Sequence, residues 1–368
     1  MGGMERHVGI LTRALAARGH DVTVFCYDPS GLNTPRIIDG VHVEPVPTLA
    51  SISSQSIAPR LVSRCIALAR ERPFDIVHQH WPDPFAHVAA TLIPGRPAHV
   101  VSWHSDIVRQ RLLRPFYRAI APTLLVTPDA LIGATLAHLR SKQIPRFAPP
   151  ERCHVIPYSI DITPFTTSAA QLQATAEIRK QYGGPLIFSL GRHVYYKGFE
   201  VLIRAMAHVP ATLLLGGEGP LTPQLRQLSK ATRARVHFLG VIPESELPLY
   251  YHAADIFCLP SIAQTEAFGL VQAEAMACGK PLVNTNLQNG VNELAPNNLC
   301  AITVPPRDEL ALSNALSRLI ENPILAARFG AAGYERISTQ YTVAVMVDKI
   351  IGVYEVLQRF RGSFRGNR

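Results

Sequence analysis

Residues 266–283 read Glu-Ala-Phe-Gly-Leu-Val-Gln-Ala-Glu-Ala-Met-Ala-Cys-Gly-Lys-Pro-Leu-Val. This stretch follows an apolar run at Ile256–Leu259, which has the length and composition of a buried strand. Gly269 and Leu270 open a helical pattern, and Pro281 begins the next strand-like run. A strand, a loop, a helix and another strand in this order predict a parallel α/β sheet.

Two carboxylates flank the predicted start of this helix. Glu266 falls in the loop, and Glu274 falls within the helix. Backbone N–H groups at Gly269 and Leu270 are expected to face an anion, as they do at helix N-termini. The two carboxylates could then hold sugar and ribose hydroxyls. The alternative is an acidic residue near a helix start and a solvated helix face.

Strand-length apolar runs alternate with helical patterns along the chain, which predicts two Rossmann-like domains with parallel sheets. A length of 368 residues with 47% apolar residues also fits two packed domains. We place the first domain at residues 1–165, a polar linker at 166–182 and the second domain at 183–341. A C-terminal helix over residues 342–360 is expected to pack back on the first domain.

The predicted strands end where the candidate site residues begin. Those of the first domain are Val22–Cys26, Ile76–His78, Val100–Ser102, Ala130–Gly133 and His154–Ile156, and those of the second are Leu186–Ser189, Thr212–Leu215, Val236–Phe238, Ile256–Leu259, Pro281–Asn284 and Ala301–Val304. Ligands of such sheets bind beyond the carboxyl ends of the strands.

The net charge is +9, which favours phosphorylated substrates, polyanions or anionic lipid surfaces. Residues Arg109 to Arg118 mix arginines with apolar side chains, which fits either a basic amphipathic helix at a membrane or a solvated helix face. No apolar run reaches the roughly 20 residues of a membrane span, and the N-terminus is charged, unlike a signal peptide. We expect a cytoplasmic protein that binds peripherally at the inner face of the cytoplasmic membrane.

The six cysteines include no Cys-x-x-Cys pair, so reduced thiols are expected.

Positive charge also follows the predicted strand Leu186–Ser189, where the loop carries Gly191, Arg192 and Lys197. Two such charges suit a diphosphate leaving group, although surface charge explains them equally well. After the next strand, Glu218 stands in a glycine-rich turn, where the backbone can approach a ligand closely.

Together these motifs resemble glycosyltransferase family 4, whose members are retaining enzymes of the GT-B fold. The family includes bacterial mannosyl- and rhamnosyltransferases of cell-surface polysaccharide assembly. The resemblance runs from Gly2 to about Tyr354 and rests most on Glu266 and Glu274 in the E-x7-E spacing, with Phe268 and Gly269 beside them. It implies an α/β protein of GT-B type, with two Rossmann-like domains whose parallel sheets face across a cleft.

The resemblance implies a role for each matching residue. Arg192 and Lys197 would bind the donor diphosphate and stabilise its departure, while Glu266 binds the transferred sugar. The implied catalytic residues are His104, Arg192, Lys197 and Glu266; the implied donor-binding residues are Gly191, Glu218, Phe268, Gly269, Leu270 and Glu274, with Glu274 on the ribose; and the implied acceptor or diphosphate loop comprises Gly2, Gly3, His80 and Trp81.

His104 follows the predicted strand Val100–Ser102, at the place where the family keeps a histidine near the reacting sugar. A lone histidine is otherwise more often structural. The glycine-rich turn at Gly2 and Gly3 opens a helix, and the family's chain begins with a strand that enters this turn. We therefore expect that the first strand of the N-terminal domain is missing, and that the natural protein has residues before Met1.

We expect a retaining hexosyltransferase that moves a hexose from a nucleotide-diphosphate sugar to a saccharide or lipid-linked saccharide acceptor in cell-surface polysaccharide synthesis. GDP-mannose is the favoured donor, with UDP- and dTDP-sugars as alternatives. No Asp-x-Asp motif stands at a strand end, so neither a metal ion nor another cofactor is expected. Two alternatives are a GT-B sugar-nucleotide 2-epimerase and a basic nucleic-acid-binding protein. The sequence has no recognisable nucleic-acid-binding module, so nucleic acid is not an expected partner.

Overall fold

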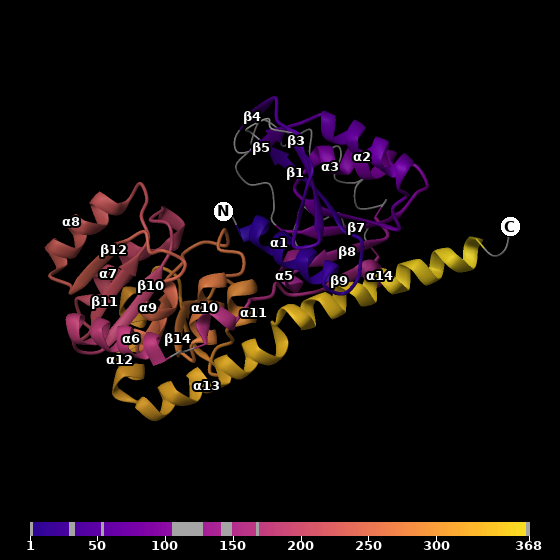
Figure 1. The fold of residues 1–368 in the computed structure, drawn as a ribbon. Coiled ribbons are helices and arrows are strands. Elements are labelled where there is room, and N and C mark those ends of the chain that lie inside the picture. The colour runs from indigo at the N-terminus through magenta and orange to yellow at the C-terminus, as the bar shows by residue number, and fades with distance from the viewer. Residues whose placement is uncertain are drawn as a thin grey trace. The chain divides into compact units, whose positions relative to one another are not determined.

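The computed structural model describes residues 3–28, 34–52, 55–104, 128–140, 149–166 and 169–365. Gly2 and the basic segment around Arg109 to Arg118 lie outside the described residues. The chain forms two compact units (Figure 1). The first comprises Met1–Ser159 and Val343–Arg368, and the second comprises Ile160–Thr342.

The second unit contains a six-stranded parallel sheet in the order β12-β11-β10-β13-β14-β15. Its strands are β10 (Leu186–Leu190), β11 (Thr212–Gly216), β12 (Val236–Gly240), β13 (Ile256–Leu259), β14 (Leu282–Thr285) and β15 (Ala301–Val304). Counted along the unit, this order is the doubly wound 3-2-1-4-5-6, and its direction reverses between β10 and β13. Ligands of such sheets bind beyond the carboxyl ends of the strands at this reversal.

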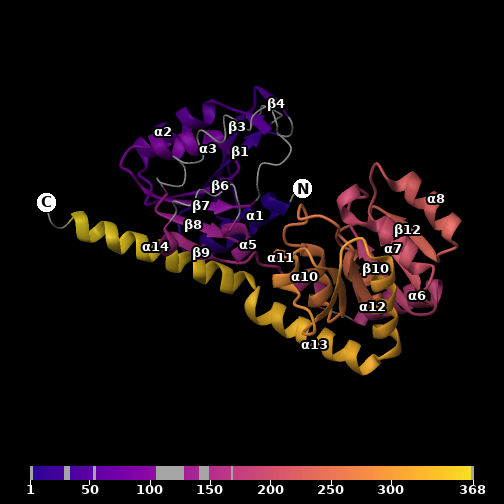
Figure 2. The same ribbon diagram turned by 180° about the vertical axis from the view of Figure 1, so that it is seen from behind.

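Helices cover both faces of this sheet (Figures 1 and 2). They are α6 (Ala169–Tyr182), α7 (Phe199–Met206), α8 (Thr222–Thr232), α9 (Leu247–Ala253), α10 (Leu270–Ala277), α11 (Gly290–Leu294), α12 (Glu309–Glu321) and α13 (Pro323–Gln340). Adjacent strand residues point to opposite faces, so Ile187 packs with α7, α8 and α12, whereas Phe188 packs against Tyr251 of α9. Burial on both faces explains why the strands are continuous apolar runs.

The linker predicted at residues 166–182 is wrong, because most of it is helix α6 of the second unit. α6 packs on α9, and Arg179 pairs with Asp255 at 3.0 Å. Only Thr175 among residues 171–182 is buried, so the helix has no apolar stripe to mark it in the sequence.

The first unit contains a four-stranded parallel sheet, β6-β7-β8-β9, and a three-stranded sheet, β1-β3-β2. The strands are β1 (Thr23–Asp28), β2 (Arg36–Ile38), β3 (Val41–Pro47), β6 (Ile76–Trp81), β7 (Ala98–Trp103), β8 (Ala130–Gly133) and β9 (Cys153–Val155), with a hairpin of β4 (Ala50–Ile52) and β5 (Gln55–Ile57). Strands β2 to β5 were not predicted. Pro45 and Pro47 lie within β3, and proline normally argues against a strand.

Helix α1 (Gly3–Ala16) is the first element among the described residues, and Gly3 is its first residue. The expectation of residues before Met1 stays a prediction.

The C-terminal helix α14 (Val343–Arg365) belongs to the first unit, which also contains α2 (Arg60–Glu71), α3 (Pro84–Leu92) and α5 (Leu136–Leu139). Met346 and Ile350 of α14 pack into one apolar cluster with Leu11 and Leu15 of α1.

None of the described helices is long and apolar enough to cross a membrane. The six cysteines are free.

Candidate active site

The loop after β10 lies tightly against the glycine-rich turn after β11. The N–H of Gly191 donates to the carbonyl of Gly216 at 3.2 Å, and the N–H of His193 donates to the carbonyl of Glu218 at 3.0 Å. A Cβ on Gly217, whose φ is +100°, would lie 2.1 Å from the carbonyl oxygen of Gly191. Glycine is therefore required at this position, and the turn fixes the loop that carries Arg192 and Lys197.

Lys197 and Glu266 form an ion pair at the reversal of the strand order. Lys197 ends a short 3-10 turn after β10, and Glu266 follows β13. The Nζ of Lys197 lies 2.5 Å from Oε2 of Glu266, and the two side chains are only 10% and 11% exposed. Ser261 Oγ donates to the same carboxylate oxygen at 3.1 Å. The structure thus brings together two of the predicted catalytic side chains.

Arg192 and Glu218 are exposed residues of the same two loops. Within the described part of the chain, no ion pair of Arg192 is recorded. Its guanidinium is therefore accessible to a ligand, whereas the charge of Lys197 is already balanced by Glu266. Gly191 lies beside Lys197, because a Cβ there would be 3.2 Å from the Cε of the lysine.

Glu274 is not a solvated side chain, so that alternative is wrong. The residue is 5% exposed, and the hydroxyl of Tyr251 donates to its Oε2 at 2.7 Å. Tyr251, on α9, is fully buried and was not predicted. A carboxylate with low exposure and a fixed donor has a defined orientation.

Backbone geometry positions the residues before α10. Gly269 has a φ of +72°, and a Cβ there would lie 2.8 Å from the side chain of Leu259. It precedes Leu270, the first residue of α10. Phe268 is buried, so only its backbone is available to a ligand. The side chain of Asn289 donates to the carbonyl of Glu266 at 2.7 Å and holds this loop in place.

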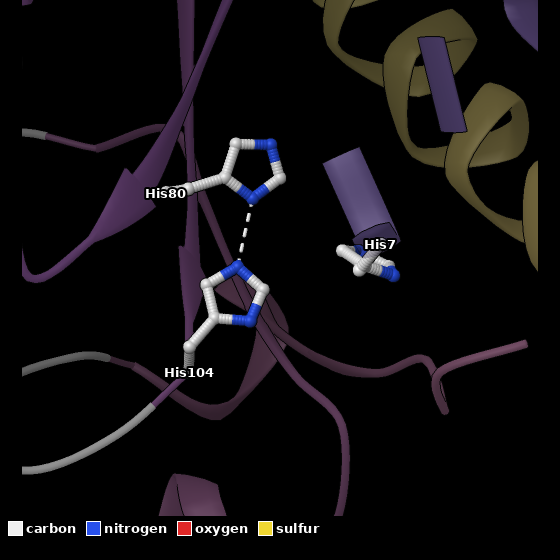
Figure 3. Close-up of side chains that lie close together, drawn as sticks. All are labelled: His7, His80 and His104. Carbon is white, nitrogen blue, oxygen red and sulfur yellow. Dashed lines mark hydrogen bonds between the residues drawn. The ribbon is translucent and has the colours of Figure 1, made fainter. Parts of the chain in front are cut away.

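In the first unit, His80 of β6 and His104 after β7 lie together (Figure 3). His80 Nδ1 and His104 Nε2 are 2.8 Å apart and share a hydrogen bond. Their rings stack with centroids 5.0 Å apart. His104 Nδ1 lies 2.6 Å from the hydroxyl of Tyr158, which was not predicted.

His7 of α1 completes this group, although no local pattern in the sequence pointed to it. Its ring centroid lies 5.4 Å from that of His104 and 5.9 Å from that of His80. Burial lowers the pKa of His7 to about 4 and holds the pKa values of His80 and His104 well below their usual value. The three imidazoles are therefore neutral at pH 7. Each offers one nitrogen, and these three atoms lie within 4.8 Å of one another, so they could hold a metal ion.

The prediction of Trp81 in the acceptor site is wrong. Its side chain is 1% exposed and stacks on Trp103, with ring centroids 5.2 Å apart. Alternate side chains of a strand point to opposite faces, so His78 and His80 share one face of β6, while Gln79 and Trp81 share the other. Trp81 therefore belongs to the core.

Family models match both halves of the chain. The model for Glycosyltransferase Family 4 matches residues 1–163, and the model for Glycosyl transferases group 1 matches residues 173–336. The chain is a GT-B glycosyltransferase of the family 4 type. The sequence left three functions open: a hexosyltransferase, a 2-epimerase and a nucleic-acid-binding protein. The family models and the named relatives support the hexosyltransferase.

Named relatives span nearly all of this glycosyltransferase. O-antigen chain mannosyltransferase C of Escherichia coli is 24% identical over 358 residues, which are 97% of this chain and 95% of that protein. D-rhamnosyltransferase WbpZ of Pseudomonas aeruginosa is 27% identical over 346 residues, which are 93% of this chain and 89% of the relative. Among solved structures, Anabaena HepE in complex with UDP has a TM-score of 0.79 at 21% identity over 96% of both chains. That likeness shows the fold.

Proposed function

We propose that this glycosyltransferase transfers a hexose, with retention of anomeric configuration, from a nucleotide-diphosphate sugar to a saccharide or lipid-linked saccharide in cell-surface polysaccharide synthesis. The observation that carries the proposal is the buried Lys197–Glu266 pair at the strand-order reversal of the second unit. The name of the Escherichia coli relative, O-antigen chain mannosyltransferase C, supports a surface-polysaccharide acceptor. GDP-mannose is the donor that we favour.

The residues of the second unit suit departure of a nucleoside diphosphate. Negative charge grows on the phosphate oxygen as its bond to the sugar breaks, and preorganised positive groups lower the energy of that state. Arg192 is accessible, and Lys197 can exchange Glu266 for a phosphate oxygen. Glu266 then accepts hydrogen bonds from sugar hydroxyls, while Glu274, oriented by Tyr251, accepts those of the ribose.

Retention follows in this proposal from attack on the face that the phosphate leaves. None of the carboxylates assigned above serves as a covalent nucleophile in this proposal, since Glu266 accepts hydrogen bonds from sugar hydroxyls and Glu274 is held by Tyr251. The leaving phosphate accepts the proton of the attacking acceptor hydroxyl. His104 orients the transferred sugar.

Transfer is also proposed to need no divalent metal cofactor, because fixed positive side chains and the N-terminus of α10 serve the diphosphate. Addition of EDTA should not lower the initial rate. A loss of activity that Mg²⁺ or Mn²⁺ restores would contradict this part of the proposal.

A donor panel tests the function directly. The full chain is incubated with GDP-mannose, UDP-hexoses and dTDP-hexoses, and nucleoside diphosphate release is measured with and without lipid-linked saccharide. We expect acceptor-dependent release with GDP-mannose and a product whose anomeric NMR signals match those of the donor. Inverted product, or no turnover of any donor, would contradict the proposal.

Peripheral membrane binding is proposed from the net charge of +9. Replacing Arg109, Arg111, Arg114 and Arg118 by Gln should weaken sedimentation with phosphatidylserine vesicles, at roughly 1 kcal/mol for each basic residue near the surface. Equal vesicle binding by the wild-type protein and the variant with four Gln substitutions at low salt would contradict a role for this segment.

A further inference from the structure

We propose that His7, His80 and His104 form a binding site for a divalent transition metal ion of the Zn²⁺ type. The three residues come from α1, from β6 and from the position that follows β7, so the fold and not a local motif brings them together (Figure 3). Their three candidate ligand nitrogens lie within 4.8 Å of one another. Three histidines with a fourth position open to water form a common zinc ligand set.

The rings must shift to bind an ion, because nitrogens that lie within 4.8 Å of one another have to reach the spacing of zinc ligands. Zn–N bonds of about 2.1 Å place two nitrogens of a tetrahedral site about 3.4 Å apart. In the structure, His80 Nδ1 and His104 Nε2 are 2.8 Å apart, so their rings must separate slightly. His7 Nδ1 is buried and has no hydrogen-bond partner among the described residues. At least one nitrogen of His7 is thus free of competing bonds.

The proton of the His80–His104 hydrogen bond must leave that bond before a metal ion can bind. Metal binding requires lone pairs on His80 Nδ1 and His104 Nε2. The shared proton is therefore exchanged through solvent for one on the remote nitrogen of the same ring, so that His80 carries its proton on Nε2 and His104 carries its proton on Nδ1, where it donates to the Tyr158 oxygen at 2.6 Å. Each imidazole remains neutral, and Tyr158 fixes the tautomer of the ligand, as the outer partners of zinc-bound histidines do.

The ligand set also selects the class of ion. Among the residues that the structure describes, the cluster offers three imidazole nitrogens and no carboxylate oxygen. Imidazole suits Zn²⁺, Cu²⁺ and Ni²⁺, whereas Mg²⁺ and Ca²⁺ require oxygen ligands. The ring of His78 stacks on that of His80, with ring centroids 4.7 Å apart. His78 Nε2 also shares a hydrogen bond with Ser102 Oγ at 2.8 Å, so His78 is held in place and limits the movement of His80 away from the cluster.

A bound ion would occupy the nitrogen of His104, which is proposed to orient the transferred sugar. Zn²⁺ should therefore inhibit transfer, a consequence that rests on the proposed function. The binding itself does not rest on that function. Metal binding and inhibition are measured separately, so that failure of one is distinguishable from failure of the other.

The test is equilibrium dialysis of the full chain, after treatment with chelator, against Zn²⁺. We expect one tight ion for each wild-type chain. His7→Gln should remove tight binding, and Tyr158→Phe should weaken it by roughly 10- to 100-fold, as loss of an outer partner does. His20→Gln is the matched control, because His20 is exposed and outside the cluster. Mg²⁺ at the same concentration should not compete.

Two results would overturn the proposal. One is a wild-type chain that binds no stoichiometric Zn²⁺, an outcome that needs no variant. The other is His7→Gln protein with an unchanged circular dichroism spectrum and undiminished Zn²⁺ affinity. Zn²⁺ should also inhibit wild-type transfer more strongly than transfer by His7→Gln, and equal inhibition of both would overturn the link between this site and activity.

Discussion

Lys197 and Glu266 are the side chains whose individual contributions are easiest to measure. Lys197→Ala should lower transfer by roughly 100-fold or more, because the variant loses a fixed positive charge at the leaving diphosphate. Lys180→Ala is the matched control, since Lys180 is an exposed residue of α6. Steady-state rates of both variants, measured with folded protein, check this prediction. A Lys197→Ala enzyme with near-normal rates would place the diphosphate elsewhere.

Glu266→Gln should separate the two tasks of this ion pair. In the structure Glu266 neutralises Lys197, so a diphosphate must compete with the carboxylate for the ammonium group. The glutamine side chain of this variant is uncharged and no longer competes with the diphosphate for Lys197. Nucleoside diphosphate alone should therefore bind more tightly by roughly tenfold, about 1.4 kcal/mol. The turnover number should fall, because the sugar contact is weakened. Titration calorimetry with GDP measures the first effect, and weaker GDP binding would contradict it.

Tyr251→Phe tests whether the buried hydroxyl orients Glu274. A hydrogen bond to a charged group contributes about 1.5–3 kcal/mol, so loss of the 2.7 Å bond should raise the KM for donor by roughly tenfold or more. The turnover number should change little. Tyr250→Phe is the control on the same helix, because Tyr250 stacks on Phe188 through its ring. Equal donor KM values for the two variants would argue against this role.

The local sequence could predict the charged residues of the donor site but not their partners. Glu266 and Glu274 stand at a fixed spacing around a recognisable helix start, and Lys197 follows an apolar strand. Tyr251 and Tyr158 act on residues 23 and 54 positions away, and no short-range pattern records such contacts. His7 was missed for the same reason.

At the scale of elements, the turn between β11 and α8 supports the loop after β10. Gly217→Ala should destabilise the second unit and raise donor KM, because its Cβ would lie 2.1 Å from the carbonyl oxygen of Gly191. Gly184→Ala is the matched control: Gly184 also has a positive φ, +64°, but open space around it, so only about 1 kcal/mol of backbone strain is expected. Urea midpoints and donor KM values measure both effects. Similar losses of stability and similar donor KM values in the two variants would mean that the close approach of Gly217 to Gly191 is unimportant.

The strands that stand out most clearly in the sequence are those with continuous burial, although the partly buried β1 and β12 were also predicted. Strands β10, β11 and β13 are apolar on both faces, so their positions were visible as short apolar runs. β2 is exposed throughout, β3 contains two prolines, and α6 has almost no buried face. These elements form because their neighbours supply hydrogen bonds and contacts, and their own residues carry little of the signal.

At the scale of the whole molecule, buried histidines make the first unit sensitive to acid. Burial lowers the pKa values of His87 and His99 from 6.5 to about 4. Between these pH values the unfolded chain binds protons that the folded chain does not, so stability is retained above pH 6.5 and falls as the pH drops towards 4. Each histidine should contribute about 1.4 kcal/mol for each pH unit in this window.

Calorimetric unfolding from pH 7 to pH 4.5 checks this sign and slope. His87→Phe should flatten the dependence by the contribution of one proton, while His20→Gln, at an exposed position, should leave the slope unchanged. Stability that rises on acidification through this range would contradict the prediction.

The central claim is that the donor diphosphate binds where the strand order of the second unit reverses. A crystal structure of the full chain with GDP-mannose or its diphosphate product tests this claim most directly. We predict diphosphate oxygens within hydrogen-bond distance of Lys197 Nζ and of the Arg192 guanidinium, with Glu266 released from Lys197. A bound diphosphate that leaves the Lys197–Glu266 pair intact and contacts neither cation would contradict the account.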